Sequence, residues 1–137
     1  MKDLGKTRYC LGLEIEYCSN DILIHQSTYI KKVLNRFYMD KSHLLNSPMV
    51  IRSLEVNKNP FCLKEENEES LGPEVPYLSA IGALMYLANC TRSDIAFSVN
   101  LLARYNSTPP KRHWNGVKHI LRYLCRTSDM DLYYSKK

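Results

Sequence analysis

Residues 77–89 read YLSAIGALMYLAN, and this stretch decides the fold of the C-terminal half. The helix that it predicts is apolar on nearly every side, at Leu78, Ile81, Leu84, Met85, Leu87 and Ala88. A helix that is hydrophobic all round is stable only when other elements bury it. The sequence therefore predicts a buried helix, which elements on both sides of this stretch must cover.

Two further helices are predicted downstream. The first is capped by Ser93 or Asp94 and carries its apolar face at Ile95, Val99, Leu102 and Tyr105. The second begins after two prolines, which are favoured in a first helical turn, and its core stripe is Trp114, Val117, Leu121 and Leu124, with Ile120 beside them. Residues 130–134 then predict a terminal strand that has no partner in this chain, and such an edge strand is expected to fray.

Upstream, residues 9–26 predict a β-hairpin. Apolar and polar residues alternate from Tyr9 to Tyr17, as in one half-buried strand, and a turn around Asn20 leads to a returning strand. Ser27 is placed to cap a helix that follows at once. Its apolar face is formed by Ile30, Val33, Leu34 and Phe37.

Residues 40–76 interrupt this regular pattern with four prolines and a run of glutamates. They predict a long, largely irregular acidic connector between two lobes. The predicted fold class is α+β, with an N-terminal hairpin and helix (residues 1–39), the connector (residues 40–76), and a C-terminal lobe of three helices with a terminal strand (residues 77–137).

Composition limits the function classes. The chain has 137 residues, 45% of them hydrophobic, which is enough to fill one core. Its five cysteines form no CxxC pair and none lies near a histidine at metal-ligand spacing, so a reduced intracellular protein without a metal or cofactor is expected. No apolar run is long enough to span a bilayer, and no secretory signal is visible at the N-terminus.

The formal net charge of +5 is unevenly distributed. No Asp or Glu occurs from Ile95 to Ser128, and the last predicted helix carries a basic face formed by Lys111, Lys118, Arg122 and Arg126. Such a face fits the phosphates of a nucleic acid, and an ordinary solvated helix surface is the alternative. The acidic run at Glu65, Glu66, Glu68 and Glu69 is expected to be solvated in the connector. Neither group of charges predicts catalysis.

Three ordered groups of motifs carry a family resemblance. They are KDLG (residues 2–5) with LGLEI (11–15), YLSAIGALMYL (77–87) with TRSDIA (91–96), and HW (113–114) with LRYL (121–124). In this order they resemble the polyprotein of copia-type retrotransposons, between the reverse-transcriptase YVDD motif and the first RNase H aspartate. The resemblance implies a non-catalytic connection region, because the polymerase and nuclease carboxylates lie outside it. It also implies that His113 packs the start of its helix in a structural role.

The chain departs from that family at three helix or strand boundaries. Ser93 stands where the family prefers proline, and Arg126 and Asp131 stand where glycine is usual. Since glycine best adopts the left-handed conformation that often ends a helix, Arg126 is expected to weaken the end of the last helix.

A second resemblance comes from a different class. Arg52, Ser53, Leu54 and Glu55 match three of the four positions of an Arg-x-Leu-Arg motif, and the acidic run that follows fits a downstream acidic element. The chain as a whole also resembles secreted RxLR-type effectors of plant-parasitic oomycetes. This resemblance implies secretion, entry into host plant cells, an unidentified host protein as partner, and suppression of defence-linked cell death.

Two hypotheses follow. On the first, the protein is a non-catalytic effector that is secreted and acts in the host nucleus or cytoplasm. On the second, it is an intracellular fragment of a copia-type polyprotein that retains weak, non-specific nucleic-acid binding. Both predict no enzyme activity, no cofactor and no membrane partner.

Overall fold

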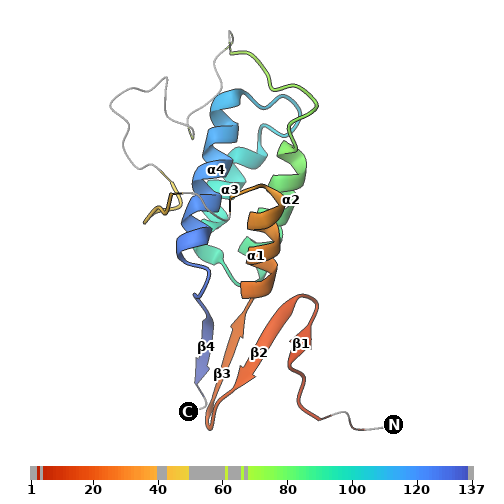
Figure 1. The fold of residues 1–137 in the computed structure, drawn as a ribbon, viewed down its shortest axis with the longest axis vertical. Helices are drawn as coiled ribbons and strands as arrows, with labels where there is room; N and C mark the ends of the chain where they lie inside the picture. Colours follow the sequence, from red (N-terminus) through yellow and green to blue (C-terminus); the bar gives the residue numbers. More distant parts are fainter. Residues whose placement is uncertain are drawn as a thin grey trace.

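The computed structural model describes residues 3, 5–39, 43–49, 61, 66 and 68–135 (Figure 1). Its sheet contains four antiparallel strands in the order β1-β2-β3-β4. Their bounds are β1 (Tyr9–Cys10), β2 (Leu13–Tyr17), β3 (Asp21–His25) and β4 (Leu132–Ser135). The helices are α1 (Ser27–Arg36), α2 (Tyr77–Cys90), the short 3-10 helix η2 (Ser93–Ile95), α3 (Ala96–Ala103) and α4 (Lys111–Arg126). The predicted α+β class, with its N-terminal hairpin and C-terminal strand, is confirmed.

One hydrophobic cluster joins all four α-helices. The side chains at its centre are almost fully buried: Ile30, Ile81, Leu84, Leu87, Val99, Leu102, Val117, Ile120, Leu121 and Leu124. Most residues of the two predicted stripes therefore face the core. Tyr105 lies beyond the end of α3 and is only half-buried, and Trp114 lies at the margin of the cluster, whereas the neighbouring His113 is fully buried. Because α1 contributes to the same cluster, the regions on either side of the connector share one core.

The terminal strand has a partner, so the prediction of an unpaired β4 is wrong. Leu132 lies opposite Ile24 and Tyr134 opposite Ile22, in an antiparallel ladder with β3. β2 pairs with one edge of β3, and β4, which follows α4 in the chain, pairs with the other edge (Figure 1). The sequence signal was local, whereas this pairing joins residues more than 100 positions apart.

Residues 9–17 form two strands and not the single strand predicted from their alternation. Leu11 and Gly12 have φ angles of 52° and 81°, and they make a tight turn between β1 and β2. Positive φ at both central residues is the geometry of hairpin turns that match strand twist. A Cβ at Gly12 would lie 3.0 Å from the hydroxyl of Tyr86 on α2, so close packing also favours glycine at this position.

The caps predicted for two helices are also wrong. Ser27 is the first residue of α1, and the Glu14 carboxylate from β2 accepts the Thr28 N–H at 3.2 Å and the Thr28 hydroxyl at 2.8 Å. Neither Ser93 nor Asp94 caps α3, because both lie in η2, which precedes it. At α1 a tertiary contact from β2 thus replaces the local cap that the sequence favoured.

The described part of the connector is irregular, as predicted, but it is not detached from the core. Phe61 is buried, and Met49 packs against the same hydrophobic cluster. The carbonyl of Ser47 lies 3.0 Å from Nε2 of His119 on α4. A single β-bridge joins Ser70 to Pro110. The domain boundaries at residues 39 and 76 stay a prediction.

Candidate functional site

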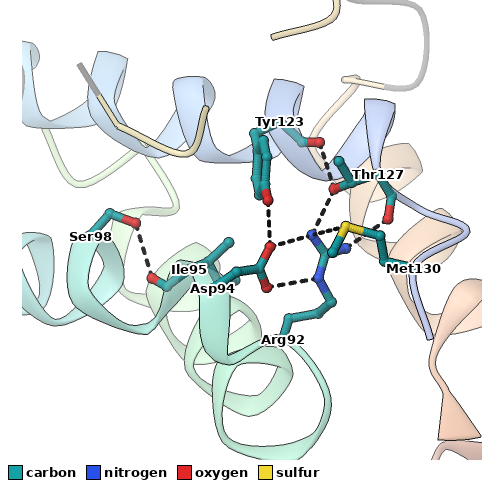
Figure 2. Close-up of polar contacts among 7 residues, drawn as sticks. All are labelled: Arg92, Asp94, Ile95, Ser98, Tyr123, Thr127 and Met130. Atoms are coloured by element: carbon teal, nitrogen blue, oxygen red, sulfur yellow. Dashed lines mark hydrogen bonds and ion pairs between the residues drawn. The ribbon is translucent and has the colours of Figure 1, made fainter. Parts of the chain in front are cut away.

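A partly buried ion pair connects the second and third groups of sequence motifs (Figure 2). Arg92 is 1% exposed, and its guanidinium donates to both carboxylate oxygens of Asp94 at 3.0 and 2.8 Å. It also donates to the backbone carbonyl of Thr127 at 2.8 Å and to the hydroxyl of the same residue at 2.6 Å. The Tyr123 hydroxyl donates to Asp94 at 2.5 Å. We call these four residues the Arg92 cluster.

The Arg92 cluster holds the end of α4 against the turn between α2 and α3. Burial alone would raise the pKa of the Asp94 carboxyl, but the hydrogen bonds from Arg92 and Tyr123 outweigh it and lower that pKa. Burial, together with the bond to Asp94, raises the pKa of the Tyr123 hydroxyl. A carboxylate that is held by a guanidinium and a phenol is a structural ion pair and is not free to bind a metal or substrate.

The hairpin turn joins the first and second motif groups near the same, C-terminal end of α2. The Tyr86 hydroxyl donates to the carbonyl of Leu11, and its ring packs edge-on to Tyr29 with 5.0 Å between ring centroids. Nearby, the Thr91 hydroxyl donates to the side-chain carbonyl of buried Gln26 at 2.7 Å. The three motif groups therefore form one connected structure, although they are far apart in the sequence.

The carboxylates of β2 also have structural partners. Glu14 and Glu16 lie 3.3 and 3.2 Å from the two ring nitrogens of His25 on β3. Burial opposes ionisation of Glu14, but the hydrogen bonds from Thr28, with further contributions from the nearby His25 and Lys31 side chains, lower the pKa of its carboxyl. Glu14 thus links the sheet to the start of α1.

The four basic residues predicted as a nucleic-acid face all lie on α4. Lys111 and Arg126 are exposed, and Lys118 and Arg122 are half-buried. Intervals of seven, four and four residues keep them on one side of the helix. That they bind nucleic acid stays a prediction.

Of the other predicted site residues, Arg52, Ser53, Leu54, Glu55 and Glu65 lie outside the described residues. Glu66 and Glu69 are exposed. The expectation of solvation is wrong for Glu68, because its two carboxylate oxygens accept from Nε and Nη2 of Arg112 at 2.8 and 2.9 Å. This bidentate pair fastens the connector to the first turn of α4.

Among the described residues, no group of three or more His, Cys, Asp or Glu side chains is arranged to hold a metal ion. His113 is buried, with its ring centroid 4.1 Å from that of Tyr105, as expected for a structural residue. In the described part of the chain, no helix combines the length and apolarity needed to cross a membrane.

Sequence reasoning missed the Arg92 cluster, since it treated Asp94 only as a helix cap. One signal pointed to it: Arg92 and Asp94 are two residues apart and lie between two strongly apolar helices. A charge in that setting has to be paired. Nothing in the sequence near Thr127 or Tyr123 indicates that these residues contact the Arg92–Asp94 pair.

Known proteins are similar to almost the whole chain. The Pol polyprotein of transposon TNT 1-94 from Nicotiana tabacum is 40% identical over 130 residues, or 93% of this chain. The putative transposon Ty5-1 protein of Saccharomyces cerevisiae is 36% identical over 98% of it. The chain is similar to retrotransposon Pol polyproteins. It spans 10% of the tobacco polyprotein and 41% of the yeast protein.

The similarity to an effector is narrower. Secreted RxLR effector protein 161 of Plasmopara viticola is 45% identical over 62 residues, which make up 45% of this chain and 44% of that protein. The predicted likeness of the whole chain to such effectors is therefore wrong in its extent. No family model and no solved structure matches the chain.

Proposed function

We propose that this chain is a non-catalytic connection region of a copia-type retrotransposon polyprotein, located between the reverse-transcriptase and RNase H parts. The observation that carries the proposal is the meeting of all three motif groups in one structure, through Tyr86 with Leu11 and through Asp94 with Tyr123. Similarity to a Pol polyprotein over 93% of the chain, and to a putative transposon protein over 98% of it, supports the same conclusion.

The absence of catalysis is part of this proposal. Two-metal polymerases and nucleases need several carboxylates that converge on the ions. Here Glu14 holds the start of α1, Asp94 holds Arg92, and Glu68 holds Arg112. These acids face different elements and are each engaged by a donor, so they stabilise the fold.

We propose further that α4 contacts the phosphates of a nucleic-acid duplex. Its face formed by Lys111, Lys118, Arg122 and Arg126 is a row of cations on a rigid helix, in a part of the chain without Asp or Glu. Cations on a regular surface neutralise phosphates without reading base sequence. Binding should therefore be weak, independent of sequence and sensitive to salt.

Fluorescence anisotropy with RNA–DNA and DNA duplexes at several salt concentrations tests this contact. Replacing Lys118, Arg122 and Arg126 by Gln should weaken binding to every duplex and lower the salt slope by about one unit for each phosphate that is no longer neutralised. A charge-matched control replaces Lys6, Arg8 and Arg104, which are exposed and lie outside α4. No salt-dependent binding by the wild-type chain, or equally weakened binding in the two triple variants, would contradict a specific role for α4.

An effector function is the second candidate, and one observation favours it: the 62-residue similarity to an RxLR effector. It would act in host plant cells by binding a host protein and suppressing cell death. The genomic sequence on either side separates the two candidates. A continuous reading frame with YVDD upstream and an RNase H aspartate downstream contradicts the effector, whereas an upstream signal-peptide exon contradicts the polyprotein.

A further inference from the structure

An open groove lies between α1 and the end of α4. It has a volume of about 320 Å³ and is lined by Lys31, Leu34 and Asn35 of α1, by Cys125 of α4 and by Ser128, which follows that helix. Lys31 brings an ammonium group, and Asn35 and Ser128 bring neutral hydrogen-bond donors. Among the described residues, no Asp or Glu lines the groove. A cation and neutral donors without an acid favour an anion as the ligand.

The groove continues the basic face of α4. Arg126 directly follows Cys125 in that helix, and Arg122 lies one turn before it. α1 packs beside α4 (Figure 1), and neither helix contains an Asp or Glu. α1 also exposes three cations of its own, Lys31, Lys32 and Arg36. Both helices that border the groove therefore carry positive charge and no negative side chain.

Two nearby features oppose an anion, and each is already engaged by another group. The C-terminal end of a helix carries partial negative charge. At α4 the carbonyl of Thr127 accepts from the Arg92 guanidinium, which offsets part of that charge. Glu14 interacts electrostatically with Lys31, but its carboxylate accepts two hydrogen bonds from Thr28 and does not line the groove.

We propose that this groove binds a backbone phosphate of the nucleic-acid duplex that contacts α4. Lys31 is the cation of the site, and Asn35 and Ser128 donate to the phosphate oxygens. The duplex would then rest on two helices, with α1 as a further part of the interface. This inference rests on the proposed contact of α4 with nucleic acid. Because the contact is to a phosphate, it adds affinity without base preference.

Fluorescence anisotropy with the RNA–DNA and DNA duplexes at several salt concentrations also tests the groove. Lys31→Gln should weaken binding by about two- to fivefold and lower the salt slope by about one unit, since one phosphate is then no longer neutralised. Lys32→Gln is the matched control, because it removes the same charge from the next residue, which is exposed but does not line the groove. This control should keep the affinity and the slope close to those of the wild type.

The neutral donors give a second test that does not depend on charge. Asn35→Ala with Ser128→Ala should weaken binding to each duplex but leave the salt slope unchanged, because no cation is lost. Circular dichroism and urea unfolding check that each variant is folded. An unchanged affinity in this double variant would overturn the assignment of the two residues as donors.

The failure of the groove and the failure of the α4 contact give different results. Equal effects of Lys31→Gln and Lys32→Gln, in a protein whose α4 triple variant binds more weakly than its control, would overturn the groove and leave the α4 contact in place. Weaker binding by Lys31→Gln, together with an α4 triple variant that matches its control, would overturn the α4 contact and support the groove. A wild-type chain that binds no duplex would overturn both.

Discussion

Replacing Arg92 by Met is the most direct test of how the motif groups are held together. Methionine keeps much of the apolar stem but removes the guanidinium, which makes four hydrogen bonds to Asp94 and Thr127 (Figure 2). The variant therefore leaves the Asp94 carboxylate without its cation, and it removes the donor to the carbonyl of Thr127, the C-cap residue of α4.

The expected cost follows from burial. Removing one partner of a buried ion pair costs about 3–5 kcal/mol, because the other charge stays buried and uncompensated. The side chain of Arg92 is 1% exposed, but that of Asp94 is 30% exposed and water can partly solvate it. We therefore expect the lower end of the range, about 3 kcal/mol, for Arg92→Met.

A double-mutant cycle in urea identifies the source of this loss of stability. Arg92→Met with Asp94→Asn should cost less than the sum of the two single variants by about 1–2 kcal/mol, since no carboxylate is then left unpaired. Arg104→Met, on an exposed site, should change the free energy of unfolding by less than about 0.5 kcal/mol. A folded Arg92→Met protein within about 1 kcal/mol of the wild type would refute the assignment of the cluster as the main polar link.

Two further predictions use the same unfolding assay. Gly12→Ala should destabilise the protein by about 1–2 kcal/mol, because alanine is strained at φ 81° and its Cβ would lie 3.0 Å from the Tyr86 hydroxyl. The control Gly82→Ala, at an open helical site, should stabilise it by about 0.5–1 kcal/mol, and a similar effect of both variants would contradict the tight turn. The pKa of the Asp94 carboxyl is lowered in the folded state, so this group stabilises the protein above its unfolded pKa of about 3.9, and that stabilisation is lost as the pH falls through the lower folded value. Urea unfolding midpoints measured from about pH 6 downward should therefore drop less steeply for Asp94→Asn than for the wild type.

The sequence predicted those parts of the fold that depend on local periodicity. The stripe of α4 and the apolar surface of α2 were found because a 3.6-residue repeat records which side of a helix is buried. The pairing of β4 was missed since nothing in residues 130–134 specifies β3 as its neighbour. The turn at Leu11 and Gly12 was missed because alternation continues through a two-residue turn without a break. For the candidate site, the basic face on α4 could be placed from spacing alone, whereas the Arg92 cluster could not, because Arg92 and Thr127 are brought together only by the fold.

The end of α4 shows how a tertiary contact replaces a missing local signal. The resemblance to copia-type proteins led us to expect a weakened helix end, since Arg126 stands where glycine is usual. The helix nevertheless ends at Arg126, and its C-cap Thr127 has φ −110°, which is outside the left-handed region that favours glycine. The Thr127 hydroxyl donates to the Tyr123 carbonyl at 2.9 Å, and Arg92 donates to the Thr127 carbonyl. These bonds satisfy carbonyls that a glycine-based cap would otherwise satisfy with backbone N–H groups. Because Arg92 also holds Asp94, the end of α4 depends on the same ion pair that joins α4 to the turn after α2.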